Sequence, residues 1–188
     1  MGVNFWGVVH GIRAFLPHLV TGGGHIVNTA SVAGLMPGFG VSYDASKHAV
    51  VAVSEDLYND LSQANVSVGV SVLCPGWVRT SILDAERNWP STLGAKPTPD
   101  AARQIVTKHV GRAIAEATTP AEIADHVAHA VEHDRFRVIP HDEFLELVVR
   151  RWERNAERLD PEPSTEVPGL PSRETLMAEM LAAMNADS

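Results

Sequence analysis

Tyr43 and Lys47 stand four residues apart in the run Tyr43-Asp44-Ala45-Ser46-Lys47. Residues at this spacing are neighbours on one face of a helix, so the phenol and the ammonium would lie side by side. A phenol has an ordinary pKa of about 10, and a positive charge held beside it favours the ionised form. The pair therefore predicts a tyrosine, carried on a helix, that gives or takes a proton.

Further polar and turn-forming residues precede and follow this pair. Ser31 comes directly after the apolar segment 25–30, which has the composition of a short buried strand. Asn4 lies nearer the amino terminus, and residues 74–80, Cys-Pro-Gly-Trp-Val-Arg-Thr, follow a second strand-like run. Open parallel sheets bind their ligands at the carboxyl ends of the strands, so Ser31 is a candidate site residue.

The apolar pattern predicts the elements that must position these groups. A helical period runs over 3–19, and the three glycines at 22–24 predict a turn. Buried strands are predicted at 25–30 and 66–73, separated by a loop at 31–41 and a long helix at 42–64. Strands that alternate with helices predict an α/β fold with a doubly wound parallel sheet. The glycines leave a helix and enter a strand, the reverse of a nucleotide-binding loop, so we expect no phosphate site there.

The remainder of the chain predicts a long connection, more helices and one short strand. The connection covers 74–98, with a helical piece near 81–87, and a connection of this length is typical of a functional lid. Helices are predicted at 99–116 and 120–133, each begun by a proline, followed by a strand at 136–139 and a helix from 143 to about 158 capped by Asp142. We expect a domain at 1–158, and then, at 159–188, a proline-rich linker and an amphipathic helix.

Composition excludes several classes of protein. The net charge of −8 and the pI of about 5.5 argue against a nucleic-acid-binding protein, because there is no basic stripe to neutralise phosphates. No apolar run approaches the roughly 20 residues of a membrane span, and the first residues carry no basic leader, so neither a membrane protein nor a signal peptide is expected. Cys74 is the only cysteine, which suits a reducing cytoplasm.

Two residue clusters have both a functional and a structural interpretation. His126, His129 and His133 share one helical face, but side chains in a row on a straight helix converge poorly on one ion, so we expect a solvated face and no metal. The long connection also contains four large apolar residues, Trp77, Ile82, Leu83 and Trp89. They either form an apolar wall for a substrate or cover the sheet, and the sequence pattern does not favour one of these two interpretations.

In their order and spacing, Asn4, Ser31, Tyr43, Lys47 and the Pro-Gly turn of residues 74–80 resemble the short-chain dehydrogenase/reductase family. The resemblance covers about residues 1–158 and implies a Rossmann-like fold. It implies interconversion of a secondary alcohol and a ketone, with hydride exchanged with NAD or NADP. Tyr43 would then be the acid or base, with Lys47 lowering its pKa, Ser31 holding the substrate oxygen and Asn4 joining a water-mediated proton relay.

The resemblance also implies a cofactor site and partners. Tyr43 and Lys47 would contact the cofactor together with residues of the segment after the second strand: Pro75, Gly76, Val78 and Thr80. Pairing of the helices at 3–19 and 42–64 would give a homodimer or a homotetramer. Methionine and tryptophan near the predicted lid also favour a hydrophobic alcohol or ketone as substrate.

The chain departs from the family pattern at its amino terminus. The glycine-rich turn after a first strand would precede Met1, and at least two strand-helix units, roughly 60 residues, would be missing. The sequence therefore leaves two alternatives to a dehydrogenase. One is a catalytically inactive fragment that keeps the pairing helices and binds a longer relative. The other is an isomerase or dehydratase that uses the same tyrosine and lysine.

Overall fold

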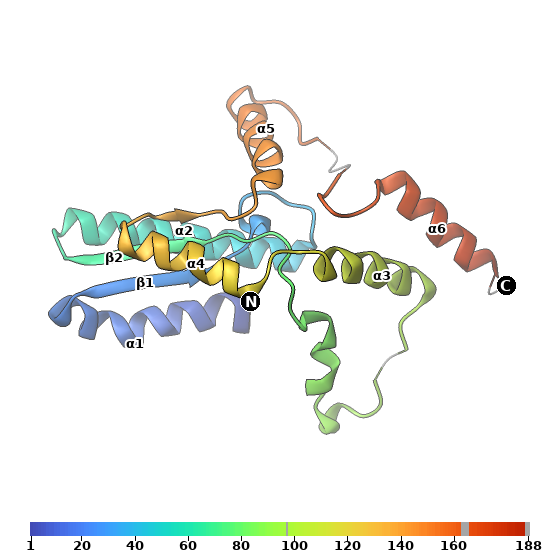
Figure 1. Ribbon diagram of the computed structural model, residues 1–188, viewed down its shortest axis with the longest axis horizontal. Helices are drawn as coiled ribbons and strands as arrows, with labels where there is room; N and C mark the ends of the chain where they lie inside the picture. Colours follow the sequence, from blue (N-terminus) through green and yellow to red (C-terminus); the bar gives the residue numbers. More distant parts are fainter. Residues whose placement is uncertain (97, 163–165, 187–188) are drawn as a thin grey trace. The chain divides into compact units, whose positions relative to one another are not determined.

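The structure is a computed structural model that describes residues 1–96, 98–162 and 166–186 (Figure 1). The chain divides into two compact units. The first unit contains residues 1–76 and 121–162, and the second contains the described residues of 77–120 and 163–188. Each unit is described by itself below.

The first unit is built on a parallel sheet whose described strands run in the order β1, β2, β3. Their bounds are Gly24–Thr29, Val68–Leu73 and Arg137–Val138. β1 pairs with β2 along its whole length, from Gly24 opposite Val68 to Thr29 opposite Leu73. Among the described strands β1 has no partner on its other side, so it forms an edge of the sheet. The predicted parallel α/β arrangement is confirmed.

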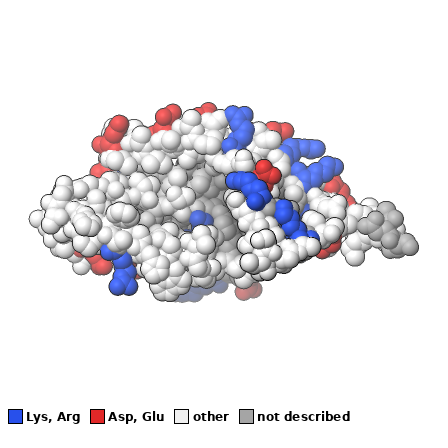
Figure 2. Space-filling view, turned by 90° about the horizontal axis from the view of Figure 1, so that it is seen from below, with Lys and Arg blue, Asp and Glu red and all other residues white. Residues whose placement is uncertain are grey.

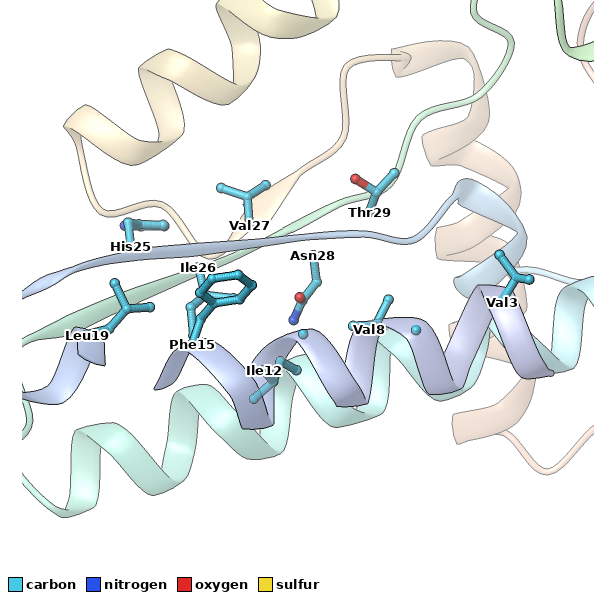
Figure 3. A pocket seen from close by; sticks show the side chains of 12 residues that line it. Val3, Val8, Ile12, Phe15, Leu19, His25, Ile26, Val27, Asn28 and Thr29 are labelled. Carbon is cyan, nitrogen blue, oxygen red and sulfur yellow. The ribbon is translucent and has the colours of Figure 1, made fainter. Parts of the chain in front are cut away.

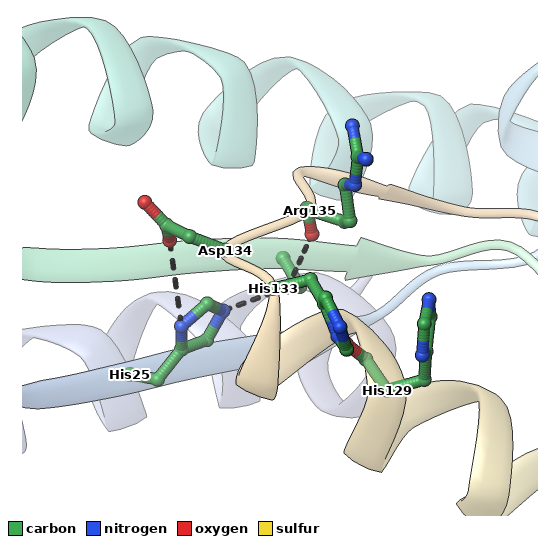
Figure 4. Close-up of polar contacts among 6 residues, drawn as sticks. His25, His129, His133, Asp134 and Arg135 are labelled. Atoms are coloured by element: carbon green, nitrogen blue, oxygen red, sulfur yellow. Dashed lines mark hydrogen bonds and ion pairs between the residues drawn. The ribbon is translucent and has the colours of Figure 1, made fainter.

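Helices cover both faces of this sheet. A π-helical turn at Gly2–Trp6 leads into α1 at Gly7–Gly22, and α2 spans Val41–Gln63. The carboxyl-terminal helices are α4 at Pro120–Glu132 and α5 at Leu145–Ala156. α4 lies on the opposite face of the strands from α1 and α2 (Figure 4). Side chains of α1, α2 and the strands meet in one core cluster that contains Leu61, Val68 and Val70, which explains the near-continuous valine run of β2.

The second unit pairs two helices, α3 at Ala101–Ala115 and α6 at Arg173–Ala186. Short 3₁₀ segments lie at Ile82–Asn88 and Ser91–Leu93. His109 of α3 lies with Nε2 2.7 Å from Oε2 of Glu179 on α6, and this hydrogen bond lowers the pKa of the Glu179 carboxyl. The predicted last helix therefore packs against α3.

Two predicted helix starts are wrong. Asp100, not Pro99, begins α3, because its carboxylate accepts a hydrogen bond from the Arg103 backbone N–H at 2.7 Å. Asp142 does not cap α5, because residues Asp142–Phe144 form a 3₁₀ turn that precedes the helix. Phe144 is fully buried, and the tight turn places its ring in the core before the helix begins. The other helix and strand ends differ from prediction by a few residues, the usual uncertainty of element ends.

Among the described residues, no helix is both long enough and apolar enough to cross a membrane.

Candidate active site

Ser31 lies where β1 ends, as predicted, and it is buried. Its hydroxyl oxygen accepts a hydrogen bond from the Ala33 backbone N–H at 3.2 Å and begins the 3₁₀ turn Val32–Gly34. The same hydroxyl donates to the carbonyl oxygen of Pro75 at 3.3 Å. Ser31 therefore joins the end of β1 to the segment that follows β2.

Tyr43 and Lys47 occupy the first two turns of α2, so the predicted helical spacing is confirmed. Nζ of Lys47 lies 5.8 Å from the centre of the Tyr43 ring. It also donates a hydrogen bond to the carbonyl oxygen of Thr29 at 3.0 Å, at the carboxyl end of β1. Burial lowers the pKa of Lys47, against a smaller opposite effect of Cys74. The Lys47 ammonium is therefore partly removed from solvent where it lies beside the Tyr43 ring.

Asn4 reaches the same helix from the π-helical turn. Its Nδ2 donates to Oγ of Ser46 at 3.4 Å, and that hydroxyl donates to the carbonyl oxygen of Tyr43 at 2.7 Å. Ser46 is almost completely buried. The contact of Asn4 is therefore with Ser46, a residue that was not predicted as part of the site although it stands inside the Tyr43 to Lys47 run.

Two residues from the carboxyl-terminal part of the first unit, His141 and Phe144, contact the Pro75-Gly76 turn. The Gly76 backbone N–H donates to Nδ1 of His141 at 3.1 Å. A Cβ atom at position 76 would overlap Cε2 of Phe144, so only glycine fits here. The Pro75 carbonyl oxygen also accepts from the Val32 backbone N–H at 3.0 Å. His141 and Phe144 were not predicted, because they are separated from Gly76 by more than 60 residues.

Val78 and Thr80, the other predicted cofactor residues, belong to the second unit. Val78 forms an isolated parallel bridge with Thr118, and the neighbouring Arg79 N–H donates to the Thr118 carbonyl oxygen at 2.9 Å. Thr80 is exposed. The first unit thus contains five parts of the predicted site: Asn4, Ser31, Tyr43, Lys47 and the Pro75-Gly76 turn. The other two predicted cofactor-binding residues, Val78 and Thr80, belong to the second unit.

The chemistry of three of these side chains is compatible with the nicotinamide end of the predicted cofactor. Ser31, Tyr43 and Lys47 provide a hydroxyl, a phenol and an ammonium near the carboxyl ends of parallel strands, where such ligands bind in open α/β sheets. The loop that leads from β1 into α2 contains glycines, but its backbone N–H groups at residues 38–40 bond to the Asp44 carboxylate, so they do not offer a free site for a pyrophosphate.

Two of the three histidines of the predicted cluster stack on one another at the end of α4. The rings of His129 and His133 have centroids 4.0 Å apart, and Nδ1 of His133 is 2.8 Å from the carbonyl oxygen of His129. In the part of the chain that the structure describes, no group of three or more His, Cys, Asp or Glu side chains could hold a metal ion.

A second polar cluster has the residue types of a nucleophilic triad (Figure 4). Nε2 of His25 lies 2.7 Å from Oγ of Ser71, and its Nδ1 lies 3.7 Å from the Asp134 carboxylate. However, the Ser71 hydroxyl donates to the carbonyl oxygen of Arg135 at 2.7 Å, so His25 must donate to Ser71 and cannot act as its base. Ser71 is also fully buried. The cluster therefore ties β1 to β2 and to the turn after α4.

A groove of about 570 Å³ lies between α1 and the unpaired edge of β1 (Figure 3). The side chains of Ile26 and Asn28 point towards α1, and Phe15 and Leu19 face the strand from the helix (Figure 3). α1 carries one charged side chain, Arg13, and the left part of Figure 2, where α1 lies, is largely uncharged. The groove is therefore an apolar surface beside the sheet, and Ser31, Tyr43 and Lys47 do not line it.

Comparison with known proteins identifies relatives of this chain. A family model for short-chain dehydrogenases matches residues 1–91. The "CLA biosynthesis dehydrogenase/reductase" of Lactiplantibacillus plantarum is 31% identical over 160 residues, which are 82% of this chain and 56% of the relative. A short-chain dehydrogenase/reductase from Burkholderia phymatum, solved in complex with NAD, is 37% identical with a TM-score of 0.79 over 88% of this chain and 60% of that chain.

A third relative shares the fold alone. A short-chain dehydrogenase from Sphingobium yanoikuyae, solved in complex with NADPH, is 22% identical with a TM-score of 0.54 over 88% of this chain and 57% of that chain. This chain thus spans less than two thirds of the length of each of the three relatives. Through residues 1–91, which contain Asn4, Ser31, Tyr43 and Lys47, it belongs to the short-chain dehydrogenase/reductase family.

Proposed function

We propose that this chain is the catalytic part, at residues 1–158, of an NAD- or NADP-dependent oxidoreductase that interconverts a secondary alcohol and a ketone. The observation that carries the proposal is the placement of Lys47: its ammonium bonds to the end of β1 while it stands beside the Tyr43 ring. That arrangement holds a positive charge next to a phenol at the end of the sheet where ligands bind.

In the proposed reaction, Tyr43 donates its phenolic proton to the carbonyl oxygen of the ketone, or accepts a proton from the alcohol. Lys47 stabilises the phenolate that remains. Ser31 exchanges its hydrogen bond with the Pro75 carbonyl for one with the substrate oxygen. Asn4 acts on this end of α2 through Ser46. The nicotinamide, when bound, supplies or accepts the hydride.

The proposed cofactor site rests on the position of the Pro75-Gly76 turn after β2 and on the cofactors that were solved with two similar proteins. We propose that the nicotinamide end lies against Pro75 and Gly76, with Val78 and Thr80 contributing from the following segment. One relative was solved with NAD and another with NADPH, so both cofactors are candidates.

The substrate and partners are proposed from exposed apolar side chains. Ile82 and Leu83, in the segment after Gly76, are exposed, which supports a hydrophobic alcohol or ketone. Trp6, just before α1, and Phe15, within α1, are exposed, which supports a homodimer or homotetramer built on α1 and α2. Cytoplasmic location is proposed from the single, free and buried Cys74.

A second candidate is favoured by the unpaired edge of β1 and the apolar groove beside it. Both are consistent with a catalytically inactive fragment whose exposed strand and helix bind a longer relative.

Cofactor titration separates the two candidates. Purified chain is added to NADH and, separately, to NADPH, and fluorescence quenching is followed together with the mass of the particle in solution. Saturable quenching, and turnover of a panel of apolar ketones that requires Tyr43, supports the oxidoreductase. Self-association with no quenching and no turnover supports the binding fragment.

A further inference from the structure

A loop of six residues, 35–40, joins the turn that follows Ser31 to the helix that carries Tyr43. The 3₁₀ turn after Ser31 ends at Gly34, and α2 begins at Val41, so residues 35–40 are the only covalent link between the two sides of the site. Gly38 and Gly40 have positive φ angles of 141° and 131°, which only glycine adopts easily. Something other than regular secondary structure must therefore hold this loop.

The Asp44 carboxylate provides the first anchor. Asp44 follows Tyr43 directly and is buried. Its oxygens accept hydrogen bonds from the backbone N–H groups of Gly38 at 2.9 Å, Phe39 at 3.3 Å and Gly40 at 3.3 Å. Hydrogen bonds to an ionised acceptor are roughly twice as strong as those between neutral groups. The end of the loop is thus wrapped around the residue next to Tyr43.

His48 continues this contact one turn along α2. Its Nδ1 lies 2.9 Å from the carbonyl oxygen of Asp44, and its Nε2 lies 3.0 Å from Nη1 of Arg151. A guanidinium only donates hydrogen bonds, so Nε2 must accept. Nδ1 then carries the proton and donates to the Asp44 carbonyl. Both contacts are satisfied by one neutral tautomer of His48.

Arg151 of α5 closes the network at the other end of the loop. The same Nη1 that bonds to His48 also donates to the carbonyl oxygen of Leu35, the first residue of the loop. All these residues belong to the first unit. One guanidinium on a distant helix therefore joins the start of the loop to the helix turn that anchors its end.

We propose that Asp44, His48 and Arg151 form a strut that positions the 35–40 loop, so that Ser31 and Tyr43 act on one substrate oxygen. They are positioning residues, because none of the three touches the reacting atoms. The catalytic consequence rests on the proposed function, whereas the control of the loop does not. A displacement of about 1 Å in a catalytic group can lower the rate on the order of 100-fold, so loop control is enough to matter.

The test compares Arg151→Met with Arg151→Lys and with Arg150→Met. Arg150 is the matched control, because it lies on the same helix and its side chain bonds instead to Glu162, at 3.2 Å. Amide hydrogen exchange is measured for peptides covering residues 35–43, with β2 as the internal reference. Steady-state kcat and KM are measured on the same samples.

Arg151→Met is expected to raise the amide exchange rate in the loop at least about 10-fold and to leave the exchange rate in β2 unchanged. It is also expected to lower kcat about 10- to 100-fold, with little change in the KM for the cofactor. Arg151→Lys, which keeps a cationic donor, should restore part of both properties. Arg150→Met should resemble the wild type. Equal loop exchange in the Arg150 and Arg151 variants would overturn the strut, and so would a rise that is as large in β2 as in the loop.

The two measurements also separate failure of the strut from failure of the proposed function. If the wild-type chain shows no turnover, the oxidoreductase proposal loses its support, while the exchange comparison still decides the strut. Selective exchange in the loop then supports the strut, and equal exchange overturns it.

Discussion

Nζ of Lys47 donates a hydrogen bond to the carbonyl oxygen of Thr29 at 3.0 Å, which ties the first turns of α2 to the end of β1. This contact holds the ammonium 5.8 Å from the centre of the Tyr43 ring. A helix alone makes two side chains four residues apart neighbours, but it does not choose which end of a sheet they face. The hydrogen bond to Thr29 shows that Lys47 faces the carboxyl end of β1, two residues before Ser31.

Tyr43→Phe should abolish the proton transfer without unfolding the chain, because the phenol is partly exposed and only its hydroxyl is lost. We expect kcat to fall about 10²- to 10⁴-fold, the usual contribution of a general acid or base. Tyr58→Phe is the matched control, since Tyr58 lies on the same helix and packs on Phe136. Equal activity of the two variants would show that Tyr43 is not the acid or base of the reaction.

Lys47→Met should lower kcat about 10²-fold, a value within the usual contribution of acid and base catalysis, because the chain loses the ammonium that lies beside the Tyr43 ring and bonds to the end of β1. Steady-state kcat with an apolar ketone measures this loss. Lys108→Met, at an exposed lysine on α3, serves as the control. Equal kcat values for Lys47→Met and Lys108→Met would show that Lys47 takes no part in the reaction.

Gly76→Ala should destabilise the first unit, because the added Cβ would overlap the buried Phe144 ring. Overpacking of this kind costs about 1–3 kcal/mol, measured as the change in unfolding free energy in urea. Gly11→Ala is the control: Gly11 lies inside α1, and a Cβ added there would have open space around it, so alanine should be neutral or stabilising. A larger loss at Gly11 than at Gly76 would contradict the packing argument.

The free energy of unfolding should decrease in mild acid, because His25 becomes protonated there. Burial lowers the pKa of His25 below 6.5, and the nearby Asp134 opposes this only in part. The unfolded chain then binds the proton more readily, so the full stabilisation is present above pH 6.5 and is lost as the pH falls through the lower, folded pKa. Urea midpoints at pH 7.5 and pH 5.5 check this. His25→Gln should show a smaller difference between the two pH values than the exposed control His18→Gln.

Cys74 should resist alkylation in the folded protein. It is buried, and burial raises the pKa of its thiol to about 11, so at pH 8 about one molecule in 1,000 carries the reactive thiolate. Labelling with iodoacetamide is measured by mass before and after addition of urea. Rapid labelling without urea would mean that β2 opens readily at its end.

Several features could be predicted from sequence because they depend on local periodicity. The spacing of Tyr43 and Lys47 is a property of one helix, and the position of Ser31 follows from the length of one apolar segment. Helix starts were harder: Asp100 caps α3 and Asp142 does not cap α5, although both are aspartates near a predicted start. The difference is that Phe144, two residues after Asp142, is buried in the core before α5 begins.

The α/β order, the parallel sheet and the residue types of the candidate site can be predicted from sequence, since they follow from the hydrophobic period and from a spacing of four residues. The contacts that hold these residues in place could be found in the folded structure alone. Arg151 reaches Leu35 across 116 residues, and His141 reaches Gly76 across 65. No local pattern records such pairs, because they form only when the packing of α5 and the turn before it against the sheet brings the two segments together.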